Sequence, residues 1–171
     1  MKKLIHTQKN LDWITYPNIV ATYISDELPK DYKPTAVYGF VFKNGKLLMT
    51  DLKEGERPTR RLDIPGGHLD QGESPEQSCI REIQEETGVL VSIVRPIAYC
   101  ELTLTIPKPE NYRYPYPTSY MFFYLCEILS EETFEGNEST HGRVWLAPED
   151  FDKSEWCKEN KLLIEEVMKA I

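Results

Sequence analysis

Long apolar runs and basic surface are both scarce in this chain of 171 residues. The longest apolar run, Tyr120 to Cys126, is far shorter than the roughly 20 residues that a membrane-spanning helix needs. The chain begins with the charged residues Met1-Lys2-Lys3, but the apolar run of a signal peptide does not follow them. These features predict a cytoplasmic protein that has no membrane partner.

Positive charge is in deficit, because 20 Lys and Arg stand against 28 Asp and Glu, for a net charge of −8. A general nucleic-acid binder needs a basic surface, so we expect no stable nucleic-acid partner. A substrate that carries phosphate must then meet local basic residues. Arg57, Arg60 and Arg61, which precede a glycine-rich stretch, are candidates for that contact, and a solvated loop is the alternative.

Paired cysteines and clustered histidines are also missing from the sequence. No C-x-x-C occurs, and each cysteine lies among apolar or helical neighbours, which is typical of buried free thiols in a reducing compartment. The cysteines are Cys79, Cys100, Cys126 and Cys157. The three histidines are too scattered for a zinc site. His68 lies in the glycine-rich loop, where an exposed loop residue is the favoured interpretation and a substrate contact is the alternative.

Carboxylates, by contrast, are concentrated in residues 67–89, which read GHLDQGESPEQSCIREIQEETGV. A helix is predicted within this stretch from about Pro75 to Thr87. Ser74 is a favourable N-cap, Gln77 completes a capping box with it, and Gly88 is placed to end the helix in a left-handed conformation.

Three glutamates share one face of this predicted helix. Glu82 and Glu86 are four residues apart, and Glu82 and Glu85 are three apart, so the three side chains project from the same side. Cys79 and Ile83 form an apolar stripe that we expect to pack on a sheet. Carboxylate oxygens gathered beside a cleft favour Mg²⁺ or Mn²⁺, and such ions serve phosphate chemistry.

The segment from Gly67 to Val89 resembles the Nudix box at every required position. The family pattern is Gly, five residues, Glu, seven residues, Arg-Glu, a bulky aliphatic, any residue, Glu-Glu, any residue, Gly and a bulky aliphatic. Here it is filled by Gly67, Glu73, Arg81-Glu82, Ile83, Glu85-Glu86, Gly88 and Val89. The resemblance implies a Nudix-type α/β/α sandwich, with a mixed β-sheet between helices. It also implies hydrolysis of a nucleoside diphosphate linked to another group.

The resemblance implies roles for individual residues as well. The carbonyl of Gly66 and the carboxylates of Glu82, Glu85 and Glu86 would hold Mg²⁺, with Mn²⁺ as an alternative, and these glutamates would also act in catalysis. Glu73 and Arg81 would form a structural pair that holds the loop against the helix.

An additional ligand or general base is expected from outside the box. Glu101, Glu135 and Glu138 are the candidates, and Glu138 is included among the predicted catalytic residues. Glu135 and Glu138 lie in an acidic loop, whereas Glu101 lies in a predicted strand.

The rest of the chain predicts a sheet around this helix. Residues 35–50 read as a hairpin that turns at Asn44-Gly45, and further strands are predicted at 61–64, 89–94, 97–105, 120–128 and 144–146. Apolar spacing from Trp156 to Ile171 predicts one amphipathic C-terminal helix. We divide the chain into an N-terminal extension, residues 1–34, that packs on the domain, and a Nudix hydrolase domain, residues 35–171.

One segment outside the box, Ile106 to Thr118, combines four prolines with three tyrosines and two cations. Tyr114 is a candidate for substrate binding, as are Arg57 and Arg61, because aromatic rings can stack on a base and cations can meet phosphate. The alternative is a proline-stiffened connection whose tyrosines pack on the domain edge.

The leading hypothesis is a pyrophosphohydrolase with a nucleotide-type substrate, and nucleoside triphosphates are the first choice of substrate. Nucleotide sugars or dinucleotides are the alternative substrates, and a nucleotide-sensing module without catalysis is an alternative function. An isomerase of the isopentenyl diphosphate type is a third alternative and would use Cys100 or Cys126. A homodimer remains open.

Overall fold

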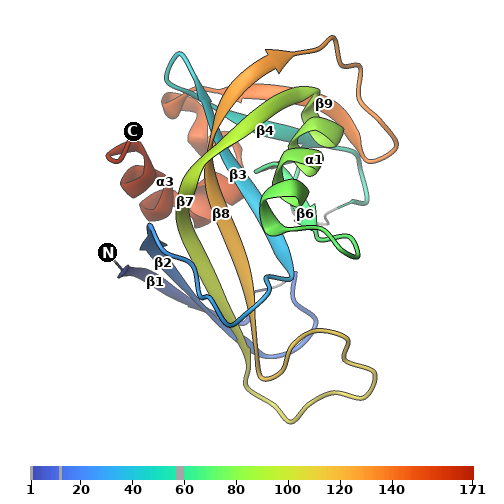
Figure 1. Ribbon diagram of the computed structural model, residues 1–171, viewed down its shortest axis with the longest axis vertical. Helices are drawn as coiled ribbons and strands as arrows, with labels where there is room; N and C mark the ends of the chain where they lie inside the picture. Colours follow the sequence, from blue (N-terminus) through green and yellow to red (C-terminus); the bar gives the residue numbers. More distant parts are fainter. Residues whose placement is uncertain (1, 12, 57–59) are drawn as a thin grey trace.

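The computed structural model describes residues 2–11, 13–56 and 60–171. Its strands are β1 (Lys2–Lys9), β2 (Asn18–Ser25), β3 (Ala36–Lys43), β4 (Lys46–Leu52), β5 (Leu62–Asp63), β6 (Gly66–His68), β7 (Val89–Leu104), β8 (Thr118–Glu131) and β9 (Thr140–Leu146). Its helices are α1 (Pro75–Thr87), the 3-10 helix η1 (Pro148–Lys153), α2 (Glu155–Glu159) and α3 (Lys161–Met168). Together they form the mixed sheet with flanking helices that characterises the Nudix-type fold (Figure 1).

The strand order is β1-β2-β7-β8-β3-β4-β5, with β6 paired to β3 and β9 paired to β4. The β3–β8 pair is parallel, and the other pairs are antiparallel, so the sheet is mixed as predicted. β8 lies near the middle of this order, and its side chains are almost all buried from Ser119 to Tyr124. Burial on both faces explains why this strand reads as a continuous apolar run.

Successive residues of the central strands bury their side chains in two separate cores, one on each face of the sheet. On β3, Val41 belongs to the core that receives Cys79 and Ile83 of α1. The neighbouring Phe40 belongs to the opposite core, which receives residues of α2 and α3 such as Trp156 and Ile164. α1 therefore lies on one face of the sheet, and α2 and α3 lie on the other (Figure 1). The buried residues of α1 include Cys79 and Ile83, whereas Glu85 on the acidic side is exposed.

Two predicted elements differ in the structure. The strands expected at 89–94 and 97–105 are one long strand, β7. Pro96 cannot donate a hydrogen bond to the neighbouring strand, and the pairing register shifts on both sides of it, so the strand continues past the proline. The single C-terminal helix is instead two short helices, α2 and α3, which meet at Asn160. All four cysteines are buried and free.

The N-terminal residues form a hairpin at the edge of the sheet. β2 pairs with β7 along Asn18 to Ile24, and β1 pairs with β2. The β1–β2 connection therefore lies beside the long β7–β8 loop, and Tyr16 contacts Tyr112 of that loop edge-on at 5.9 Å (Figure 1). No helix in the described residues is long and apolar enough to cross a membrane.

Candidate active site

The start of α1 is built as the sequence predicts. Ser74 accepts a hydrogen bond from the Gln77 backbone, and the Gln77 side chain accepts one from the Ser74 backbone, which completes the capping box. Gly88 ends the helix in the left-handed conformation at φ 68°. These end signals fix which residues belong to the helix, and therefore which way its carboxylates point.

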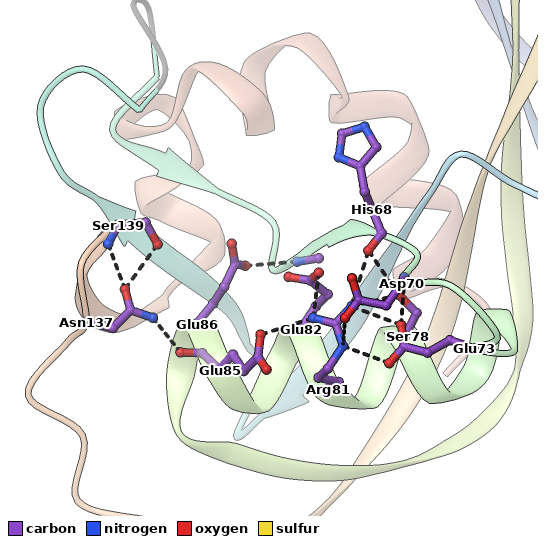
Figure 2. A network of polar contacts seen from close by, with 11 residues as sticks. His68, Asp70, Glu73, Ser78, Arg81, Glu82, Glu85, Glu86, Asn137 and Ser139 are labelled. Carbon is purple, nitrogen blue, oxygen red and sulfur yellow. Dashed lines mark hydrogen bonds and ion pairs between the residues drawn. The ribbon is translucent and has the colours of Figure 1, made fainter. Parts of the chain in front are cut away.

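The last turn of α1, which carries Glu85 and Glu86, is held by the segment that leads into β9. Asn137 Nδ2 donates to the carbonyl of Glu85 at 2.8 Å, and Thr140 Oγ1 donates to the carbonyl of Glu86 at 3.3 Å. Arg143 donates in the same way to the last helical residue. Because the last carbonyls of a helix have no partner within it, these bonds position the acidic end of α1; Figure 2 shows the one from Asn137.

Arg81 clamps the glycine-rich loop onto α1. Its Nε donates to Glu73 Oε1 at 2.8 Å and its Nη2 donates to Glu73 Oε2 at 3.0 Å, a bidentate geometry. The same Nη2 donates to the carbonyl of His68 at 3.2 Å. The Arg81 hydrogen bonds, together with one from the Asp70 backbone, lower the pKa of Glu73 to about 2. The structure thus places Glu73 and Arg81 together (Figure 2).

This clamp should make a pH-dependent contribution to stability. The pKa of Glu73 is lower in the folded state than the value of about 4.3 for a free glutamate. Its contribution is therefore complete above about pH 4.3 and is lost as the pH falls through the folded value. We expect Glu73→Gln to lower the unfolding temperature by a constant amount from pH 5 to pH 8, and the gap to wild type to close toward pH 2. Calorimetric scans across this range, with the exposed-loop variant Glu135→Gln as control, make the measurement, and a gap that does not change with pH contradicts it.

Glu86 is the carboxylate most withdrawn from solvent on the acidic face. Its Oε2 accepts a hydrogen bond from the backbone of Gly66 at 3.0 Å and one from Thr50 Oγ1 at 3.2 Å. Burial raises the pKa of Glu86 to about 7, against the lowering effect of the Gly66 bond. Gly66 also lies so close to β3 that only glycine fits there, because a Cβ at this position would lie 2.1 Å from the carbonyl oxygen of Val37.

Glu82 and Glu86 point from α1 to the same side (Figure 2), and each approaches β6: Glu86 at Gly66 and Glu82 at Gly67. Burial also raises the pKa of Glu82. Arg81 Nη1 bonds to Glu82 at 2.9 Å and to the more exposed Glu85 at 3.0 Å. Within the described ranges, no group of three or more His, Cys, Asp or Glu is arranged to hold a metal ion.

Beside Glu86 lies a hollow of about 110 Å³, here named the acidic hollow. Its lining includes Tyr38, Thr50, Glu56, Asp63, Gly66 and Glu86. Asp63 is buried and raises the pKa of Glu86 through its charge. Tyr38, Thr50, Glu56 and Asp63 all lie outside the box, and no local sequence signal marks them as part of the site. Tyr38, Thr50 and Asp63 are brought to it by the pairing of their strands, and Glu56 by the turn after β4.

A larger hollow of about 410 Å³, here named the aromatic cleft, shares Tyr38 with the acidic hollow. Tyr114, predicted as a substrate contact, lines it together with His68, and their rings stack at 5.9 Å. The backbone carbonyl of His68 accepts a hydrogen bond from Arg81, while the His68 ring points away from Arg81 and the glutamates around it (Figure 2). Tyr116 is not among the described residues that line the cleft, and its hydroxyl bonds to the carbonyl of Ile106.

The three arginines before the box have different places. Arg57 lies outside the described residues. Arg60 is buried and paired with Asp63 and Glu159, and Arg61 is exposed and bidentate to Asp51, at 2.9 and 3.3 Å. Neither described arginine lines the acidic hollow or the aromatic cleft.

The three extra glutamates also separate. Glu101 accepts from Tyr23 at 3.4 Å and pairs with Lys2 at 3.6 Å, so its contacts are with the N-terminal strands. Glu135 and Glu138 are exposed on the loop before β9. Glu138 follows Asn137, which holds α1, and precedes Ser139, which lines the acidic hollow, so this loop brings Glu138 to the neighbourhood of the box.

Comparison with known proteins agrees with this architecture. Residues 32–167 match the family model described as the NUDIX domain. The chain belongs to the Nudix family. It is 30% identical over 142 residues to an 8-oxo-dGTP diphosphatase from Haemophilus influenzae, covering 81% of this chain and 94% of that protein. Over 50 residues, 28% of this chain and 26% of the relative, it is 42% identical to an ADP-ribose pyrophosphatase from Bacillus subtilis. The chain is therefore a Nudix-type pyrophosphohydrolase.

Solved structures support the Nudix fold. A Bacillus subtilis pyrophosphohydrolase aligns with a TM-score of 0.64 at 21% identity, covering 88% of this chain and 92% of that one. A Nudix hydrolase from Nitrosomonas europaea aligns with a TM-score of 0.59 at 22% identity, covering 80% and 87% of the two chains. At these identities the likeness concerns the fold alone.

Proposed function

We propose that this Nudix protein hydrolyses the diphosphate bond of nucleoside triphosphates with the help of Mg²⁺, for which Mn²⁺ can substitute. The observation that carries the proposal is the position of Glu86, a carboxylate withdrawn from water yet opening onto the acidic hollow. The similarity to an 8-oxo-dGTP diphosphatase over most of both chains supports a nucleoside triphosphate as the substrate.

The carboxylates of the box suit a divalent cation. Glu82 and Glu86 are hard oxygen donors whose pKa values are raised by burial, and a cation beside them would offset that cost. We assign Glu82, Glu85, Glu86 and the carbonyl of Gly66 to holding it. The cation supplies neutralisation of the diphosphate charge and a bound water of lowered pKa. To take part, Glu82 and Glu85 must turn from Arg81, which now neutralises them.

The chain's own residues orient the parts of this site. Arg81 and Glu73 hold the glycine-rich loop against α1, and Asn137 holds the end of α1, so the orientation of the glutamates on its acidic face is fixed. Glu138 is our candidate for taking the proton from the attacking water, since its loop borders the acidic hollow. Tyr38 is common to the hollow and the cleft, so a substrate can place its diphosphate by Glu86 and its remaining part beside Tyr114.

Metal-dependent turnover of a nucleotide panel tests the proposal. We expect nucleoside triphosphates to yield the monophosphate and pyrophosphate with Mg²⁺ or Mn²⁺, and no product with EDTA. ³¹P NMR identifies the products, and ¹⁸O-labelled water shows which phosphorus is attacked. Release of orthophosphate, or turnover of ADP-ribose and nucleotide sugars in preference to triphosphates, contradicts the proposed substrate. The second outcome would favour the activity of the ADP-ribose pyrophosphatase relative.

A further inference from the structure

The aromatic cleft is bordered by a segment that lies outside the matched domain. The Nudix match begins at residue 32, yet Trp13, Ile14, Thr15 and Tyr16 of the β1–β2 connection line the cleft. This connection is fixed in place: Asn18 bonds through its side chain and backbone to residues 10, 11 and 16, and Tyr16 contacts Tyr112 of the opposite loop. The N-terminal hairpin therefore builds one wall of the cleft.

The chemistry of the cleft differs from that of the rest of the protein. The chain as a whole has a net charge of −8, but no carboxylate is among the described residues that line this cleft. Instead its lining is rich in aromatic residues, which are Trp13, Tyr16, Tyr38, His68, Tyr112 and Tyr114. Aromatic faces without fixed negative charge suit a flat, uncharged ring system, and stacking on such faces tolerates any base.

The cleft also has the polar features that a nucleoside requires at its edges. Asn111 and Ser119 line it, and each can donate or accept a hydrogen bond. Arg113 lines it too, with its guanidinium 4.9 Å from the ring of Tyr114 and bonded to that hydroxyl at 2.7 Å. A few polar groups in a largely apolar cleft are typical of small-molecule sites.

We propose that the aromatic cleft is the nucleobase site and that Trp13, from the N-terminal hairpin, is its stacking platform. The inference rests on the proposed function for the reacting end of the same substrate, because Tyr38 joins the cleft to the acidic hollow beside Glu86. The ligand class is a planar nucleobase on a ribose. Residues 13–16 of the β1–β2 connection thus take part in substrate selection.

Tryptophan fluorescence tests the base site without turnover. The chain has three tryptophans, and titration with a metal-free nucleoside should quench the signal of Trp13. We expect Trp13→Phe to lose this quench while still binding the nucleoside, as measured by equilibrium dialysis. Trp145→Phe is the matched control, since Trp145 lies on β9 beside Lys43, and it should keep the quench. Quenching that survives Trp13→Phe, or nucleosides that do not bind to the wild type, overturns the proposal.

Kinetics then separate base binding from the chemical step. Trp13→Leu should raise KM for a nucleoside triphosphate at least tenfold with kcat nearly unchanged, and should leave kcat/KM for base-free ribose 5-triphosphate unaltered. Trp13→Phe should keep most of the affinity, because a phenyl ring can still stack. Should Trp13→Leu fail to fold, Tyr112→Leu provides the same comparison from the opposite wall. Equal losses for both substrates contradict a base site, whereas nucleoside binding by a protein that hydrolyses nothing would refute only the proposed reaction.

Discussion

Glu86→Gln is expected to lower kcat by about a thousandfold or more at saturating Mg²⁺ while the fold stays intact. The substitution keeps an oxygen that can accept from Gly66 and Thr50, so the local hydrogen bonds survive. It removes the negative charge that we assign to the cation. Losing several kcal/mol of charge stabilisation corresponds to about this change in rate.

The same variant should be as stable as the wild type, or more stable, in metal-free buffer at pH 8. Burial disfavours the charged form of Glu86, which raises its pKa to about 7, and a neutral amide avoids that cost. Steady-state kinetics and calorimetry on the two proteins make the measurement. Glu76→Gln is the matched control on the same helix, where Glu76 is exposed and accepts only the Tyr124 hydroxyl among the described side chains. A rate near wild type in Glu86→Gln would remove Glu86 from the chemistry.

The helix that carries the site is predictable because its signals are local. The capping box at Ser74 and Gln77 and the left-handed Gly88 lie within or next to the helix, and both have the predicted form. The Glu73–Arg81 pair spans eight residues and was also foreseen, through the box pattern. Interactions within one short segment do not depend on how the rest of the chain folds.

The surroundings of the box were not predictable in the same way. Thr50 on β4 and Asp63 on β5 reach Glu86 only because these strands pair with each other in the sheet. Trp13 reaches the aromatic cleft because β2 pairs with β7, whose following loop carries Tyr112. No short-range pattern in the sequence records these pairings, so the residues looked like ordinary strand or loop positions.

Arg60 shows how composition misleads when burial is unknown. A basic residue near a phosphate site suggests a phosphate contact, and on the sequence Arg60 is a plausible one beside the substrate-binding candidates Arg57 and Arg61. The structure buries Arg60 and gives it two carboxylate partners, Asp63 and Glu159, so its charge is already compensated. A buried arginine with carboxylate partners contributes to the local fold, and removing the Arg60 side chain would leave the buried Asp63 carboxylate without this ion pair.

Gly67→Ala is expected to lower kcat about a hundredfold with little loss of stability. A Cβ at this position would lie 2.6 to 2.7 Å from the carboxylate atoms of Glu82. That carboxylate is the end of a flexible side chain, so the fold can accommodate the methyl group by moving it. The move displaces a proposed metal ligand by about 1 Å, a misplacement that typically costs about a hundredfold in rate.

Gly45→Ala provides the opposite combination of effects and so separates geometry from stability. Gly45 has φ +76° in the β3–β4 turn and nothing within 4 Å of an added Cβ, so alanine there strains the backbone without touching the site. We expect it to cost about 1 kcal/mol of stability and to leave kcat unchanged. Denaturant unfolding and steady-state kinetics on both variants complete the comparison. If Gly67→Ala lowered kcat only to the extent that it lowered the folded fraction, the position of the Glu82 carboxylate would not matter for the reaction. Loss of activity without loss of stability means that the enzyme depends on where that carboxylate lies.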